Sequence, residues 1–126
     1  MARPRPLSPH LGIWRFQLPA LMSISHRATG VILSTGTVLL TVWLLALASG
    51  AEAFALAQMV ITHPLGQLVM FGYSVVLFYH GCNGIRHLNW DLGRGLDIPD
   101  VYRSGQMVLL AAVVLTALFW LGLYLL

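Results

Sequence analysis

A histidine interrupts the second of three apolar stretches in this chain. No Asp, Glu, Lys or Arg occurs between residues 53 and 85, yet His80 lies inside that run. An imidazole in lipid is costly unless the ring has a partner, so polar groups in such stretches are candidates for functional sites. At about 100° per residue, His80, Gly84, His87 and Asp91 fall on one face of a helix. Two rings with a gap at Gly84 could form the wall of a site for a flat cofactor, and haem is the obvious candidate.

A second polar cluster lies at the start of the first apolar stretch. Ser23, Arg27 and Gly30 fall close to one line at helical spacing, and His26 lies about 60° to one side. A hydroxyl, a titratable ring and a fixed cation at one membrane depth could bind a ligand. Two other interpretations stay open, because small residues can pack against another helix and an arginine at a helix end can extend to lipid phosphates.

The composition of the chain is that of a membrane protein. The 126 residues are 58% apolar and 9% charged, and their mean hydropathy is +0.80, whereas about a quarter of the residues in a soluble domain are charged. Three segments, about 28–49, 65–88 and 106–126, are long enough to span at roughly 20 residues each. We therefore predict a single all-α domain, an integral membrane bundle of three transmembrane helices with a short N-terminal cytoplasmic segment. Three helices can wall one side of a large cofactor but not enclose it, so we expect partner subunits.

The distribution of basic residues predicts the orientation of the bundle. All seven are arginines in the N-terminal segment or around the second connection, whereas the first connection carries only Glu52 and His63. By the positive-inside rule, the N-terminus and the connection 89–105 face the cytoplasm, or the matrix of an organelle. The opening lacks the apolar region of a cleavable signal peptide, and Pro19 suits the first turn of a helix. Basic clusters interleaved with aromatics are missing, so nucleic acid is not an expected partner.

The cysteine content excludes several cofactors. The one cysteine, Cys82, cannot form an internal disulfide or a multi-thiolate metal site, and its position about 160° from His80 predicts a small packing residue. The sequence also has no dinucleotide-binding fingerprint. Flavin and iron–sulfur clusters therefore cannot be held by this chain alone.

Both polar clusters match a known pattern. Arg5-Pro6-Leu7, Leu11 and Ser23-x-x-His26-Arg27-x-Thr29 resemble the N-terminal signature of the cytochrome b membrane-anchor subunits of succinate dehydrogenase. The segment His80-x-x-x-Gly84-Ile85-Arg86-His87-Leu88-x-Trp90-Asp91 resembles the second signature of the same family. Two motifs in the right order extend the resemblance over essentially the whole chain. An anchor of the related fumarate reductases is the alternative within this pattern.

The resemblance implies a role for each site residue. His80 would be one axial ligand of a b-type haem, and a small membrane-anchor subunit would supply the second. His26, Arg27 and His87 would lie near the haem propionates, with Gly84 leaving room for the porphyrin. Ser23 and Arg27 would form part of the ubiquinone site. The remaining partners would be a flavoprotein subunit with FAD and an iron–sulfur subunit, and no activity is expected from this chain alone.

Two other function classes stay open from the residues themselves. The polar side chains could hold helices together in a non-haem structural membrane subunit, or His and Arg could form a relay in a proton-translocating or transport subunit. Only the haem-binding anchor requires a haem absorbance spectrum, so this measurement separates it from the two other classes. The lack of a presequence and of lysine favours a bacterial inner membrane over a mitochondrial one.

Overall fold

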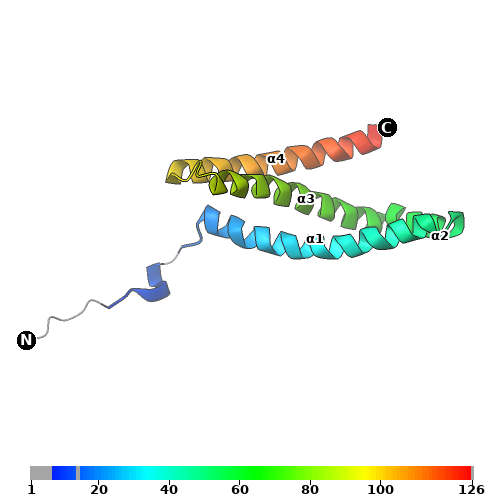
Figure 1. The fold of residues 1–126 in the computed structure, drawn as a ribbon, viewed down its shortest axis with the longest axis horizontal. Helices are drawn as coiled ribbons and strands as arrows, with labels where there is room; N and C mark the ends of the chain where they lie inside the picture. The colour runs from blue at the N-terminus through cyan, green and yellow to red at the C-terminus, as the bar shows by residue number, and fades with distance from the viewer. Residues whose placement is uncertain (1–6, 14, 126) are drawn as a thin grey trace, which may run out of the picture.

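The computed structural model describes residues 7–13 and 15–125, and these residues form helices joined by short turns (Figure 1). Arg3 and Arg5, which entered the orientation argument and the resemblance, lie outside the described residues. A 3-10 helix, η1, precedes four α-helices. Their bounds are η1 His10–Ile13, α1 Leu18–Ala48, α2 Ala51–Thr62, α3 Pro64–Asp91 and α4 Ile98–Leu125.

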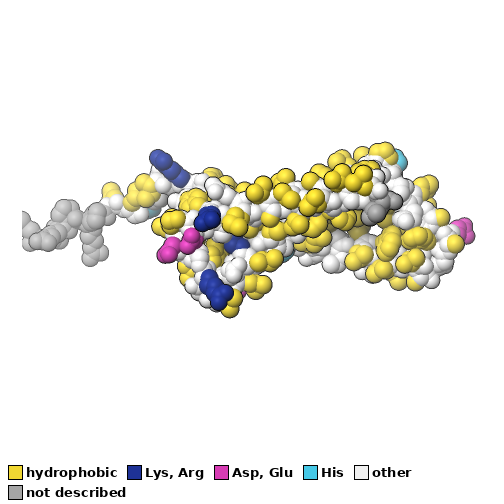
Figure 2. Space-filling view, turned by 90° about the horizontal axis from the view of Figure 1, so that it is seen from above, with side chains coloured by type: hydrophobic (Ala, Val, Ile, Leu, Met, Phe, Trp, Pro, Cys, Tyr) yellow, Lys and Arg dark blue, Asp and Glu magenta, His cyan; other side chains and the backbone are white. Residues whose placement is uncertain are grey.

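Three of the helices, α1, α3 and α4, are long and apolar enough to cross a membrane. This confirms the predicted all-α bundle with three spans. Helix α3 packs against both α1 and α4, and so it is the central element of the bundle (Figure 1). Large apolar side chains cover the outside of the helices (Figure 2). Such a surface suits a bundle surrounded by lipid tails, which are as apolar as the side chains that meet them.

The helices extend beyond the spans predicted from composition. Helix α1 begins at Leu18 rather than near residue 28, and α4 begins at Ile98 rather than near residue 106. Pro19 lies in the first turn of α1, as predicted. Apolar composition marks only the part of a helix that lies in hydrocarbon, whereas backbone hydrogen bonding continues through the polar boundary. The added turns of α1 carry Ser23 and His26 on a regular helix.

The predicted first connection contains a helix of its own. Gly50, whose φ of 110° favours glycine, turns the chain from α1 into α2. The ring of Trp43 on α1 contacts that of Phe54 on α2, with centroids 5.7 Å apart. His63, expected in a loop, instead caps α3: its Nδ1 accepts a hydrogen bond from the Leu65 N–H at 3.2 Å. Twelve residues are too few to span a bilayer, so the length of the apolar run does not mark this helix as a span.

The second connection is the short loop that its Gly, Pro and Asp content predicts. Gly93 and Gly95 adopt φ values of 70° and 68°. Trp90 Nε1 donates a hydrogen bond to the Gly95 carbonyl at 3.0 Å. This tight turn returns the chain into α4 beside the polar end of α3.

Candidate functional site

Three histidines meet between α1 and α3. The rings of His26 and His80 stack with centroids 3.9 Å apart and planes 10° apart. The ring of His87 lies 5.1 Å from that of His26. A Cβ added at Gly84 would find His26 Cε1 at 4.0 Å, so the ring from α1 lies opposite the gap on α3. The structure therefore places four of the predicted site residues side by side.

His80 is held through one nitrogen of its ring. Its Nδ1 lies 3.0 Å from Thr29 Oγ1 and 3.1 Å from the His26 carbonyl oxygen. Because a carbonyl only accepts, these partners assign the proton to Nδ1 and leave the Nε2 lone pair free. No hydrogen bond within the described residues reaches Nε2. An imidazole fixed by one nitrogen and open at the other is typical of a metal ligand.

Gly30 makes room for the ring of His80. A Cβ at this position would lie 3.2 Å from His80 Cε1, which is closer than almost all real contacts of this kind. The sequence pattern places Gly30 on one line of α1 with Ser23 and Arg27, but it does not predict this contact. The partner comes from another helix, fifty residues later in the chain, and only the packing of α1 against α3 shows it.

The Nδ1 atom of His26 is buried and has no hydrogen-bond partner among the described residues. A buried polar atom without a partner costs about 1–3 kcal/mol, so native structures rarely leave one without a reason. This atom belongs to the ring that stacks on His80. The histidine cluster is therefore polar, partly unsatisfied and open at the His80 Nε2, as expected of a site that a ligand completes.

Ser23 and Arg27 occupy the same end of α1 but remain apart from the histidine contacts. Ser23 is half-buried and Arg27 is exposed. Four residues separate them, so they share one side of the helix. Neither side chain has a hydrogen bond or ion pair within the described part of the chain. A hydroxyl and a free guanidinium at this boundary can donate to carbonyl or anionic oxygens of a ligand.

The sequence pattern does not predict the surroundings of Arg86. The side chain is 5% exposed. Its guanidinium donates from Nε to Ser104 Oγ at 2.9 Å, from Nη1 to Asn83 Oδ1 at 3.3 Å and from Nη2 to the Val101 carbonyl at 2.8 Å. It also lies 4.0 Å above the centre of the Trp90 ring. This arginine joins α3 to α4 instead of extending toward lipid headgroups.

The Arg86 hydrogen bonds continue to α1 through Asn83. Asn83 is fully buried, and its Nδ2 donates to the Met22 carbonyl at 3.4 Å. Tyr79 and Ser25 donate to the same carbonyl, each at 3.1 Å. The network thus ties all three spanning helices together at one end. The sequence carries only a partial signal, because Asn83 and Arg86 form an i, i+3 polar pair at the end of an apolar run.

Comparisons with known proteins identify the family to which this sequence is similar. The sequence profile of the family described as Succinate dehydrogenase/Fumarate reductase transmembrane subunit matches residues 1–119. A succinate dehydrogenase cytochrome b556 subunit from Paracoccus denitrificans is 43% identical over 114 residues, which cover 90% of this chain and 88% of the relative. The mitochondrial cytochrome b560 subunit from Homo sapiens is 45% identical over 123 residues, covering 94% and 69%. The cytochrome b556 subunit from Rickettsia felis is 38% identical over 116 residues, covering 92% and 90%.

Proposed function

This chain belongs to the succinate dehydrogenase/fumarate reductase transmembrane subunit family, and we propose that it is the cytochrome b membrane anchor of a succinate dehydrogenase. The observation that carries the proposal is His80, whose Nδ1 is held by Thr29 and the His26 carbonyl while Nε2 stays open. The relatives described above are named as succinate dehydrogenase subunits, which favours succinate oxidation over the fumarate reductase alternative.

The histidine cluster fits a b-type haem. His80 would bind the iron through Nε2, and the small membrane-anchor partner would supply a second ligand, since His26 and His87 belong to the same wall as His80. His26, with its orphaned Nδ1, would join Arg27 and His87 as a donor to the propionates, and Gly84 would leave space at the wall. When bound, the haem would supply one-electron redox chemistry.

Ser23 and Arg27 would form this chain's part of the ubiquinone site. Reduction to ubiquinol adds two electrons and two protons, and negative charge builds on the carbonyl oxygens before the protons arrive. The Ser23 hydroxyl can donate to one oxygen, and the fixed charge of Arg27 stabilises the developing negative charge. Arg27 lies toward the polar end of α1, the end from which protons would reach the quinone.

The other chemistry would belong to partner subunits. A flavoprotein subunit with FAD would oxidise succinate, and an iron–sulfur subunit would carry the electrons to the membrane. This chain would anchor both at the arginine-rich end of the bundle, in a bacterial inner membrane with the N-terminus in the cytoplasm. Bacterial and mitochondrial relatives both match the chain, and the lack of lysine favours the bacterial setting.

A reporter assay tests this orientation. A reporter fused after Leu126 should behave as periplasmic, and one inserted near Gly95 as cytoplasmic, because an odd number of spans separates the two ends of the chain and the arginines stay inside. Finding both reporters on the same side would contradict the three-span topology.

The proposed function is tested on the purified assembly. The chain should co-purify with a flavoprotein, an iron–sulfur protein and a second small membrane protein, each identified by mass spectrometry. The reduced complex should show the absorbance of a six-coordinate b-type haem. An assembly with these subunits but no haem would indicate a structural anchor. Purification without them would favour the transport alternative.

A further inference from the structure

Side chains of α3 converge on the peptide that joins Met22 to Ser23 in α1. Tyr79 reaches the Met22 carbonyl through its hydroxyl at 3.1 Å, and Asn83 reaches it through Nδ2 at 3.4 Å. The Tyr79 hydroxyl also lies 2.5 Å from Ser25 Oγ, which bonds to the same carbonyl. The tyrosine therefore holds this peptide directly or through Ser25.

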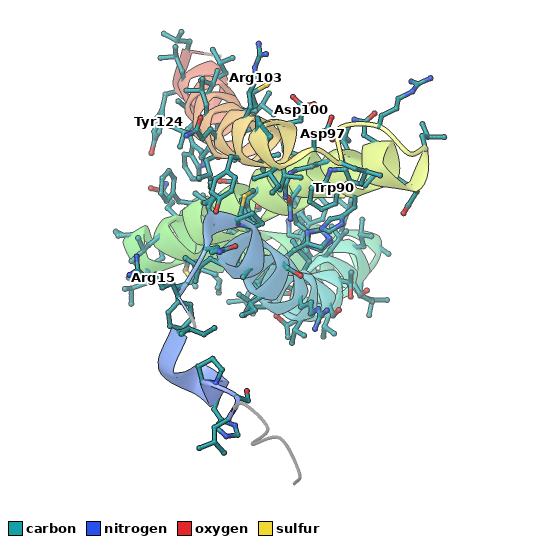
Figure 3. All side chains as sticks on the ribbon, turned by 90° about the vertical axis from the view of Figure 1, so that its left-hand side faces the viewer. Arg15, Trp90, Asp97, Asp100, Arg103 and Tyr124 are labelled. Carbon is teal, nitrogen blue, oxygen red and sulfur yellow. The ribbon has the colours of Figure 1, made fainter. Side chains whose placement is uncertain are left out.

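The side chain of Met22 is held from α4. Met22 is 2% exposed, and a Cβ added at Gly105 would lie 2.9 Å from its Sδ. The missing side chain at Gly105 thus leaves room for the methionine. Figure 3 views the bundle from this end, where α1, α3 and α4 are all in contact. Residue 22 is fixed through its carbonyl by one helix and through its side chain by another.

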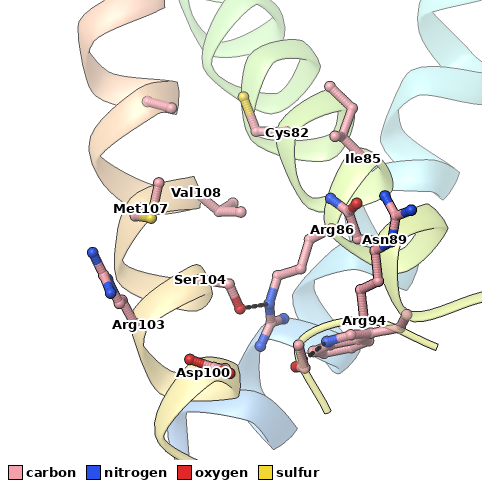
Figure 4. A pocket seen from close by; sticks show the side chains of 13 residues that line it. Cys82, Ile85, Arg86, Asn89, Arg94, Asp100, Arg103, Ser104, Met107 and Val108 are labelled. Carbon is pink, nitrogen blue, oxygen red and sulfur yellow. Dashed lines mark hydrogen bonds between the residues drawn. The ribbon is translucent and has the colours of Figure 1, made fainter. Parts of the chain in front are cut away.

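Asn83 is itself fixed in place. It is fully buried, and its Oδ1 accepts a hydrogen bond from Arg86 Nη1. Arg86 in turn donates from Nε to Ser104 of α4 (Figure 4). An amide bonded at both ends keeps one orientation, because turning it would leave buried polar atoms without partners. The donor that faces the Met22 carbonyl is therefore set from α4.

Holding this carbonyl also sets the position of Ser23. The atoms of a peptide unit lie in one plane from the Cα of one residue to the Cα of the next, so a fixed Met22 carbonyl fixes the Cα of Ser23. The serine hydroxyl is attached directly to Cβ and cannot extend to follow a ligand, whereas the long side chain of Arg27 can. A donor stabilises developing charge best when its position is set before the reaction.

We propose, on the basis of the quinone role proposed for Ser23, that Tyr79 and Asn83 are positioning residues for quinone reduction. They hold the Met22 peptide so that the Ser23 hydroxyl meets a quinone oxygen at one fixed place. Neither residue touches the quinone, and each acts through Ser23.

Quinone kinetics of the assembled complex test the role of Tyr79. Tyr79→Phe removes the hydroxyl and keeps the ring. The kcat of ubiquinone reduction should fall about fivefold, because a 1 Å displacement can cost on the order of 100-fold and we expect a shift of a few tenths of an ångström. The KM for quinone should not change, since a donor to developing charge acts in the transition state. Succinate oxidation by a dye that accepts electrons upstream should also stay normal.

Tyr73→Phe is the matched control. It removes the same group from the same helix, where the Tyr73 hydroxyl lies 2.6 Å from Thr35 Oγ1 of α1. Thr35 is about 18 Å beyond Ser23 along the helix, at about 1.5 Å per residue. The kcat of this variant should match the wild type. An equal loss in Tyr73→Phe and Tyr79→Phe would overturn the proposal, because both hydroxyls would then act only by joining helices.

A double variant shows whether Tyr79 acts through Ser23. In the Ser23→Ala background the positioned hydroxyl is gone, so adding Tyr79→Phe should lower kcat no further. Losses that multiply independently would overturn the proposal. Normal kcat in Tyr79→Phe with impaired Ser23→Ala would overturn it and leave the quinone site in place. Normal turnover in Ser23→Ala itself would contradict the quinone role of Ser23, and the positioning role with it.

Asn83→Asp tests the second donor. The carboxylate keeps an acceptor for Arg86 and takes the Nδ2 donor from the Met22 carbonyl. The kcat should fall with an unchanged KM, and again only while Ser23 is present. If Tyr79→Phe does not assemble, this variant decides the outcome, and a wild-type kcat in Asn83→Asp would then overturn the proposal.

Discussion

Helix α3 carries polar side chains on two faces that differ in how completely they are hydrogen-bonded. Toward α4, the Arg86 guanidinium has three acceptors and an aromatic ring, and Asn83 is bonded on both sides. Toward α1, His80 is bonded only through Nδ1, and the buried His26 Nδ1 has no partner among the described residues. The two faces of α3 thus border a satisfied polar network and an unsatisfied polar cluster.

This difference distinguishes polar residues that pack helices together from polar residues that bind a ligand. A buried polar network with every member bonded holds helices in one arrangement. A buried polar cluster that lacks partners costs free energy until something binds it. Residue type alone does not distinguish a packing residue from a binding residue, because placing either Arg86 or His80 in lipid costs free energy. The hydrogen-bond partners of each side chain do distinguish them.

Removal of Arg86 should have the largest effect on stability. Arg86→Ala leaves Asn83 Oδ1 without a donor and takes one of two side-chain donors from the Val101 carbonyl, so we expect a loss of about 3 kcal/mol in the free energy of unfolding. The thermal midpoint of the complex and the yield of assembled protein measure it. Arg103→Ala, which removes the exposed arginine directly before Ser104, should change neither. A wild-type thermal midpoint for Arg86→Ala would show that the hydrogen-bonded network around Arg86 does not stabilise the bundle.

Changes at Ser23 and Arg27 should affect quinone chemistry more than assembly. Arg27→Leu should lower quinone reduction by roughly 100-fold, the effect of losing one preorganised donor to a developing charge. Ser23→Ala should have a smaller effect in the same direction, because a neutral hydroxyl is a weaker donor. Electron transfer to ubiquinone is compared with succinate oxidation by a dye that accepts electrons upstream. Normal quinone turnover in both variants would place the site elsewhere.

Crowding at Gly30 should give the smallest effect. Gly30→Ala places a Cβ 3.2 Å from His80 Cε1, and the ring must shift by a few tenths of an ångström. We expect retained haem with an altered reduction potential, because ligand orientation tunes the metal. Redox titration of the haem measures it. Gly72→Ala on α3 is the control, since its Cβ would meet nothing within 4 Å; equal potentials in all three proteins would show that the α1 contact does not orient His80.

The sequence predicts the spans and the shared face of His80, Gly84 and His87, because both depend on local periodicity. It does not predict the depth of Arg86, whose position near the end of an apolar run is equally compatible with a boundary arginine. Burial is decided by Ser104 and Val101 from α4, which approach only when the turn at Gly93 and Gly95 is formed. Contacts between distant segments have no local signature.

The same limit applies to the partners of His80. The Gly30 contact, like the hydrogen bond from Nδ1 to the His26 carbonyl, requires α1 and α3 to pack at one register. The family resemblance implied the role of His80, and the comparisons confirm the family. The geometry adds which nitrogen is free and why.

The ligand assignment is tested most directly by the low-spin haem signal of the assembled complex in four histidine variants. His80→Ala should lose the six-coordinate signal, because it removes the imidazole that would bind the iron. His26→Ala should keep it, since the carbonyl that holds His80 belongs to the backbone. His87→Ala should keep the haem with shifted properties, and His63→Ala, at the far end of α3, should match the wild type. An unchanged signal in His80→Ala at normal assembly, with loss in another variant, would contradict the account.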